Sequence, residues 1–263
     1  MFEMLVDAGP HAGGPFLQTV LSLARHVEGF ACGFQVLPLQ PPVALSFETT
    51  LLEAEEQGAR ARRDWWLAQC AQAGVEGEWE VLRGEIGPAI AKRSRLADLV
   101  CLEVSVAGGA RDALSPEPDR ALVQAAGPLL LVPSTWNGAT GARVLVAWNG
   151  SAEAANAIRA ALPLLAKATD ICVLDGEQAC LPGITPSPLP LQAWMIRHGI
   201  QAQWESLDPS RQRESSLADV ARRMDADLLV MGAYGHHWTS AFGRSHMTQS
   251  LLSHVDRPIL LSH

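Results

Sequence analysis

The sequence lacks an excess of basic residues. It has 20 lysines and arginines against 28 aspartates and glutamates, which gives a formal net charge of −8. Non-specific binding to nucleic acid needs clustered positive charge, so this balance argues against a nucleic-acid partner. It leaves room for a nucleotide, because a local loop can hold phosphate inside an acidic protein.

Long apolar runs are missing as well. No segment reaches the roughly 18 apolar residues that a membrane-spanning helix needs. The first residues, Met1-Phe2-Glu3-Met4-Leu5, lack the basic segment and long apolar stretch of a signal peptide. We therefore expect no association with a membrane and a cytoplasmic location.

Motifs for catalysis and for metal binding are scarce too. The five cysteines are scattered without a Cys-x-x-Cys pair, which favours reduced thiols over zinc or redox chemistry. The chain has no Gly-x-Ser-x-Gly elbow and no P-loop. Three late histidines, His236, His237 and His246, have no carboxylate or cysteine at metal-ligand spacing, so exposed loop histidines are the better interpretation. We expect a protein that is not an enzyme and that holds no metal.

The sequence does contain an internal repeat, in which both halves share one order of elements. Ala97-Asp98 and Ala226-Asp227 each follow a helical segment and open an apolar run. Each run is later followed by a second short apolar strand that carries a proline, at 128–133 and 258–261. The two halves therefore repeat the same order of elements.

A polar, glycine-containing stretch at 134–141 separates the repeats and is typical of a linker. We place the domain boundary there, with one domain over 1–135 and the other over 141–263. At about 130 residues each, both halves are near the common size of a domain.

Within each half, continuously apolar strands alternate with helical segments. This pattern indicates an α/β fold with a parallel sheet whose two faces are covered by helices. We expect strands near 2–8, 30–37, 77–82, 98–104 and 128–132, then 143–148, 170–174, 201–206, 227–231 and 258–262. We expect helices near 14–27, 47–74, 85–95 and 116–125, then 152–166, 188–198, 214–224 and 246–254. Asn149-Gly150-Ser151 supplies a cap for the helix that starts at 152.

The strand near 227–231 runs into a turn that contains Gly232 and Gly235. A glycine-rich turn between a strand and a helix can present backbone N–H groups to phosphate. The segment resembles the nucleotide loop of the universal stress protein family, which is Gly, two residues, Gly, nine residues, then Gly followed by Ser or Thr. Here Ser245 stands at the third glycine and His246 at the Ser/Thr position.

The duplicated layout resembles the tandem members of this family, in which two Rossmann-like domains pair within one chain. The resemblance implies that the terminal strands, Leu129–Val132 and Ile259–Ser262, pair antiparallel and protect two sheet edges. The chain would then be an intramolecular pseudo-dimer that is able to form a homodimer.

The resemblance also implies where a nucleotide would bind. In nucleotide-binding members, an Asp at the end of strand one contacts the adenosine part and the strand-four loop holds the phosphates. Asp7 has the strand-one position in the first half, and Asn149 or its neighbour Trp148 has it in the second. The candidate residues are Asp7, Asn149, Gly232, Gly235, Arg244, Ser245 and His246.

Other features weigh against phosphate. Glu103 stands where the second half has Gly232, and a carboxylate there would repel phosphate. Gly232 and Gly235 either cradle a phosphate or only permit a tight turn with positive φ. Trp65 and Trp66 on the long helix are interpreted as core or interface anchors rather than a ligand platform.

Three functions stay open at this point. The first is a non-catalytic stress-response protein with degenerate nucleotide sites and no cofactor, acting through an unidentified protein partner or a small ligand. The second is an ATP-binding protein with slow hydrolysis or nucleotide-dependent switching through the 232–247 loop. The third is a structural protein that binds a partner through the helix near 47–74.

Overall fold

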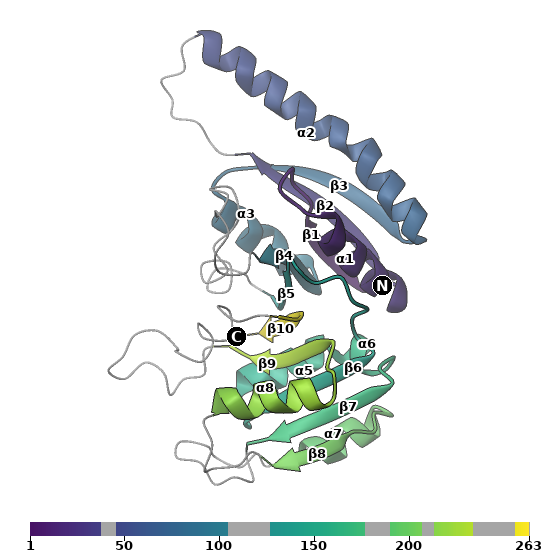
Figure 1. Cartoon of the computed structure of the whole chain (residues 1–263). Coiled ribbons are helices and arrows are strands. Elements are labelled where there is room, and N and C mark those ends of the chain that lie inside the picture. Colours follow the sequence, from purple (N-terminus) through teal and green to yellow (C-terminus); the bar gives the residue numbers. More distant parts are fainter. Residues whose placement is uncertain (38–45, 105–126, 177–189, 207–212, 234–255, 263) are drawn as a thin grey trace, which may run out of the picture.

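The structure is a computed structural model that describes residues 1–37, 46–104, 127–176, 190–206, 213–233 and 256–262. Ten strands form one sheet in the order β3-β2-β1-β4-β5-β10-β9-β6-β7-β8. The first five strands along the chain make one half of this sheet and the last five make the other (Figure 1). The expected fold, two five-stranded α/β units in tandem, is confirmed.

The elements of the first half match the expected ranges within a few residues. They are β1 (Glu3–Asp7), α1 (Gly14–His26), β2 (Phe30–Leu37), α2 (Ser46–Ala73), β3 (Glu76–Arg83), α3 (Ile86–Arg93), the 3-10 turn η1 (Ser94–Leu96), β4 (Leu99–Val104) and β5 (Leu129–Pro133). The helix expected near 116–125 lies outside the described residues.

The second half repeats the plan with shorter helices. Its elements are β6 (Arg143–Trp148), α5 (Ala152–Ala160), α6 (Leu162–Leu165), β7 (Asp170–Asp175), α7 (Leu191–Arg197), β8 (Gln203–Ser206), α8 (Arg213–Arg223), β9 (Leu228–Gly232) and β10 (Ile259–Ser262). The single helix expected over 152–166 is divided in two, because Pro163 in the first turn of α6 has no N–H to continue the ladder. The helix expected near 246–254 lies outside the described residues.

The two halves meet through their last strands. β5 and β10 pair antiparallel, with Leu130 opposite Leu260, while the other strand pairs in the sheet are parallel. The expected antiparallel pairing is therefore confirmed. Pairing these two edges removes the unpaired N–H and C=O groups that each half alone would expose.

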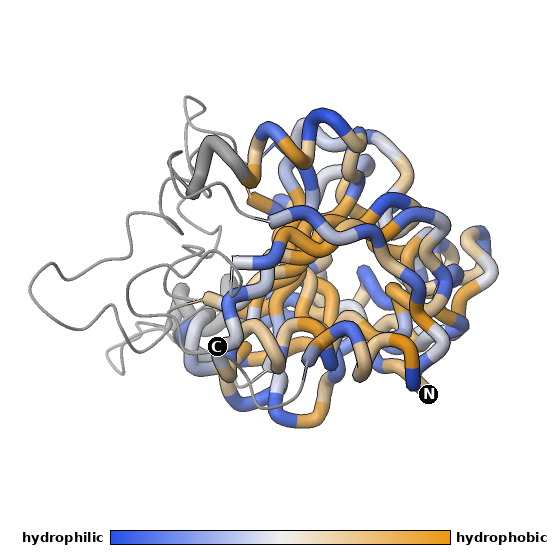
Figure 2. The backbone as a smooth tube through the Cα atoms, turned by 90° about the horizontal axis from the view of Figure 1, so that it is seen from below, coloured by the Kyte–Doolittle hydropathy of each residue, from blue (hydrophilic) through white to orange (hydrophobic). Residues whose placement is uncertain are grey.

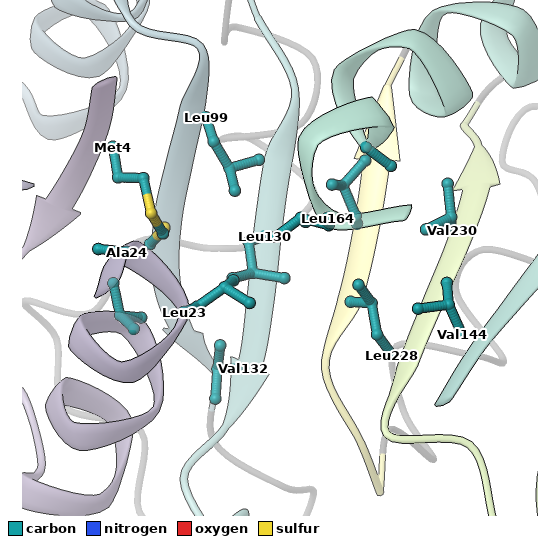
Figure 3. Packing of buried hydrophobic residues seen from close by; sticks show 14 of the residues in the cluster. Met4, Leu23, Ala24, Leu99, Leu130, Val132, Val144, Leu164, Leu228 and Val230 are labelled. Atoms are coloured by element: carbon teal, nitrogen blue, oxygen red, sulfur yellow. The ribbon is translucent and has the colours of Figure 1, made fainter. Parts of the chain in front are cut away.

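Helices cover both faces of the sheet, and one apolar cluster crosses the joint between the halves. On one face this cluster joins buried residues of α1, α2, α5, α6 and α7 to alternate strand residues, including Leu130 and Leu260. α3 and α8 pack on the opposite face. Figure 3 shows Leu23 of α1 beside Leu130 and Val132, with Val144, Leu228 and Val230 of the second half further along the sheet. In Figure 2 the strands are largely hydrophobic and the outer helices carry most of the hydrophilic residues.

The repeated Ala-Asp pair has a structural role in each half. Asp98 accepts a hydrogen bond from the N–H of Glu3 at 2.7 Å, and Asp227 accepts from the N–H of Arg143 at 3.0 Å. Both aspartates thus hold the start of the first strand of their own half. This matching contact sets Glu3 and Arg143 as equivalent positions, from which the rest of the two halves can be aligned.

Candidate functional site

The carboxyl ends of β1 and β4 in the first half bring polar groups together, as expected for an open α/β sheet. Asp7, the last residue of β1, is buried with 2% of its surface exposed. Its Oδ2 lies 3.1 Å from Nε2 of His11, and its Oδ1 accepts from the N–H of Gly9. Asp7 therefore orders the turn between β1 and α1.

Glu103 of β4 reaches across to the start of α1. Its Oε2 accepts a hydrogen bond from the N–H of Gly13 at 2.8 Å, and Gly13 is the N-cap of the helix. The N-terminus of a helix carries partial positive charge and unpaired N–H groups, which makes it a place for an anion. In the first half that place is taken by a carboxylate of the chain itself.

α2 adds a cation to the same edge. Nη2 of Arg62 donates to the carbonyl oxygens of Ala8 at 3.1 Å and Gly9 at 3.3 Å. The guanidinium also lies 4.2 Å from the centroid of the Trp65 ring. Burial lowers the pKa of Arg62.

The start of α5 in the second half is organised differently. Ser151 is the N-cap, and its hydroxyl oxygen accepts from the N–H of Ala154 at 3.1 Å, which confirms the expected cap. Asn149 is exposed, and its Oδ1 accepts from the N–H of Ser151 at 3.1 Å. The contact that the structure shows for Asn149 is therefore a turn contact within its own loop.

Gly232 is needed for close packing. A Cβ at this position would lie 2.5 Å from the nitrogen of Ala154 and 2.7 Å from the carbonyl carbon of Glu153. Gly232 is not one of the described glycines with a positive φ. The expectation that it permits a tight turn with positive φ therefore does not hold for this residue. The end of β9 lies directly against the first turn of α5, and only glycine fits there.

The sheet register corrects one assignment made from the sequence. Asp7 pairs with Phe34 five positions into the β1–β2 ladder that starts at Glu3, and Ala147 takes the same place in the β6–β7 ladder that starts at Arg143. The counterpart of Asp7 is therefore Ala147, and neither Asn149 nor Trp148 has that position. The sequence comparison missed this because it aligned the turns, and the turn after β6 begins one residue later.

The same register confirms that Glu103 and Gly232 are equivalent. Glu103 pairs with Val132 on β5, and Gly232 pairs with Ser262 on β10. Four other candidate residues, Gly235, Arg244, Ser245 and His246, lie outside the described residues. The structure therefore places Asp7, Asn149 and Gly232, but in two different halves.

Three contributors to this edge, His11, Gly13 and Arg62, were missed by sequence reasoning. His11 follows Asp7 by four residues and Arg62 precedes Trp66 by four, which is a weak signal without a fold. Trp66 itself is fully buried, as expected for a core anchor.

Other chemistry is limited within the residues that the structure describes. No group of three His, Cys, Asp or Glu side chains there could hold a metal ion. Cys32, Cys70, Cys101 and Cys172 are buried free thiols, and burial raises the pKa of Cys172 to about 11. None of the described helices has both the length and the apolar character to cross a membrane.

Solved structures with this fold span the whole chain. A universal stress protein from Archaeoglobus fulgidus DSM 4304 matches with a TM-score of 0.75 at 16% identity, over 99% of this chain and 97% of that chain. A protein from Pseudomonas aeruginosa UCBPP-PA14, provisionally named a universal stress protein, matches with a TM-score of 0.60 at 13% identity, over 99% and 92%. A protein of unknown function from Pseudomonas aeruginosa PAO1 matches with a TM-score of 0.58 at 12% identity, over 99% and 92%.

These likenesses establish the fold. The class is a tandem α/β protein with two Rossmann-like halves in one sheet. More particularly, the chain has the fold of the universal stress proteins, as the sequence resemblance implied. No family model and no curated protein matches the sequence.

Proposed function

We propose that this protein is a non-catalytic, stress-response binding protein whose two nucleotide sites are degenerate. The observation that carries the proposal is the hydrogen bond from the N–H of Gly13 to Glu103 at 2.8 Å. A phosphate at the start of α1 would have to displace this carboxylate and then lie beside its negative charge. Two like charges at contact distance in a partly buried site repel strongly.

The second half supports the same proposal in another way. Its strand-one position is Ala147, which has no side-chain group that could accept a hydrogen bond from a ligand. Ser151 already satisfies one N–H of α5, and Gly232 lies against the helix start. The protein would then act through a protein partner or a small ligand other than a nucleotide.

A second candidate function is ATP binding with slow hydrolysis or switching through the 232–247 loop. One observation favours it. At the position of Glu103 the second half has Gly232, so β9 brings no carboxylate to the start of α5. A phosphate there would meet less repulsion than in the first half.

Calorimetry with ATP and with AMP separates the two functions. The protein is first unfolded and refolded, so that any carried-over ligand is removed. We expect no heat of binding for either nucleotide up to millimolar concentration. Micromolar ATP binding that is lost in Gly235→Val would overturn the proposal and establish the second function.

A further inference from the structure

The helix α2 is longer than the part of the sheet that it covers. It has 28 residues, whereas β2 and β3 have 8 residues each. At about 1.5 Å per helical residue and about 3.3 Å per strand residue, the helix is about 42 Å long and the strands about 26 Å. In Figure 1 the N-terminal part of α2 extends past the ends of both strands. Since a helix without packing partners is only marginally stable in water, this part has much to gain from a second surface.

α2 has one covered face and one exposed face. Trp66 and Cys70 are buried on the side that packs on the sheet. On the other side, Ala54, Ala61 and Ala68 are exposed. These alanines are seven residues apart, or about two helical turns, so they form one row along the helix. Small side chains on an exposed row allow another helix to approach closely.

Gly58 lies beside this row and has no evident role within the chain itself. A glycine in the middle of a helix lowers stability relative to alanine. A Cβ at Gly58 would have nothing within 4 Å, and Gly58 is not one of the described glycines with a positive φ. Neither packing nor backbone conformation in one copy therefore calls for a glycine, whereas the close approach of another helix does. We call Gly58 and the row of alanines the outer face of α2.

The charges beside the outer face are complementary to themselves. Glu53 and Arg60 are exposed and seven residues apart, so they lie on the same side of the row of alanines. If two copies of α2 run antiparallel about a two-fold axis near Gly58, Glu53 of one copy lies beside Arg60 of the other. The same register sets Ala54 opposite Ala61, and each contact occurs twice. A parallel pair in register would set like charges side by side instead.

We propose that the outer face of α2 is the interface of a homodimer, in which the α2 helices of two copies pack antiparallel. The second half has no helix of this length, because α7, between β7 and β8, has 7 residues. A two-fold contact uses the same face of both copies, so association stops at the dimer. This interface does not involve Glu103 or the start of α1, so it is independent of the absence of nucleotide binding.

Sedimentation velocity of the full chain over the micromolar range tests the proposal. We expect a reversible dimer that weakens as salt is added, because the charged contacts are close to solvent. Arg60→Glu should weaken the dimer about tenfold or more, since it brings like charges together twice. Arg63→Glu is the matched control. Its side chain is 62% exposed against 72% for Arg60, but it lies about 200° around the helix from Ala61 and should leave the dimer unchanged.

A mixing experiment separates a lost interface from a damaged fold. Glu53→Arg should weaken the dimer as Arg60→Glu does, for the same reason. When the two variants are mixed, each copy supplies the charge that the other lacks, so the mixture should form dimers nearly as tightly as the wild type. Two misfolded variants would show no such recovery.

Cross-linking tests the antiparallel direction. Gly58→Cys lies near the two-fold axis, so a mild oxidant should join two copies of this variant by a disulfide. Ala68→Cys lies on the same face, but antiparallel packing separates its two copies by about 30 Å along the helix, whereas a disulfide needs Cα atoms within about 7 Å. It should therefore not cross-link. The wild-type chain gives the background from its own cysteines.

Three results would overturn the proposal. One is a chain that stays monomeric over the whole concentration range, which would leave the outer face to a different protein. Another is a dimer that Arg60→Glu and Arg63→Glu weaken equally or not at all, because the interface would then lie elsewhere. The third is a Gly58→Cys variant that cross-links no more than the wild type.

Discussion

The two halves of this protein use different residues to satisfy the N–H groups at the start of their first helix. At α1 the N–H of Gly13 is satisfied by Glu103, which is 90 positions away in the chain. At α5 the side chain of the N-cap Ser151 accepts a hydrogen bond from the N–H of Ala154 in the same helix. Gly232, at the position of Glu103, lets β9 approach this helix closely. One structural position thus holds either a long-range cap or a close backbone contact.

This difference teaches that equivalent positions can serve the start of a helix in different ways. Helix starts have N–H groups that must find partners. A carboxylate of the chain itself can be such a partner, as Glu103 is for Gly13. Five predictions test the comparison between the halves, from the largest effect to the smallest.

The largest effect should come from the joint that the halves share. Leu130 and Leu260 are fully buried and lie opposite each other. Truncating either one to Ala should lower the free energy of unfolding by about 2–5 kcal/mol, because each leaves a cavity in the common core. Urea denaturation measures the change, and Leu96→Ala, at a side chain 84% exposed, is the control with little effect. If the two variants lost very different amounts of free energy of unfolding, β5 and β10 would not contribute equally to the core at the joint.

The next effect tests the close contact at α5. Gly232→Ala should destabilise the protein by about 1–3 kcal/mol, since the new Cβ meets backbone atoms that cannot turn away. Gly14→Ala at the start of α1 is the matched variant, because nothing lies within 4 Å of a Cβ there. Thermal unfolding of the pair compares the two. A Gly232→Ala protein as stable as wild type would show that β9 and α5 can separate at no cost.

The third prediction compares the two equivalent aspartates. Asp227 is 1% exposed and accepts from the N–H groups of Gly141 and Arg143, whereas Asp98 is exposed and accepts from the N–H of Glu3. Asp227→Ala should cost about 1–2 kcal/mol and Asp98→Ala less than about 1 kcal/mol. Equal losses in chemical denaturation would contradict the difference in burial.

Asp227 also gives this comparison a pH dependence. Burial raises the pKa of Asp227, against the hydrogen bonds from Arg143 and Gly141, which lower it. The folded chain then binds the proton more readily than the unfolded chain, so this group's contribution to stability falls as pH rises between the unfolded and folded pKa. The fall should disappear in Asp227→Asn, as followed by urea denaturation from pH 3 upward, about one unit below the unfolded pKa of Asp.

The smallest effect concerns Glu103. Glu103→Ala should lower stability by about 1 kcal/mol, the usual value of a helix cap, and Glu103→Gln should lose less because it keeps an acceptor. The same Ala variant should gain weak affinity for inorganic phosphate, measured by calorimetry, because the start of α1 is then open to an anion. If Glu103→Ala changed neither the stability nor the affinity for phosphate, Glu103 would neither cap α1 nor keep an anion from its start.

Much of the fold was predictable because its signals are local. Continuous apolar runs such as 99–102 and 228–231 indicated buried parallel strands, and the repeated Ala-Asp pair located equivalent strands in both halves. The division of the helix after Ala160 was missed, although Pro163 signals it. The equivalence of Asp7 with Asn149 was wrong because turns of different length cannot be aligned without the register of the sheet.

The sequence by itself determined the class of fold and the duplication, since these follow from periodicity and repetition along the chain. The pairing of the terminal strands was expected only from the resemblance to a known family. Only the tertiary structure decided what meets at the carboxyl edge. The contact of Glu103 with Gly13, the approach of Gly232 to Ala154 and the hydrogen bond from Arg62 to Ala8 join residues far apart in sequence. Such contacts depend on strand order and register, which are set by packing of the whole sheet.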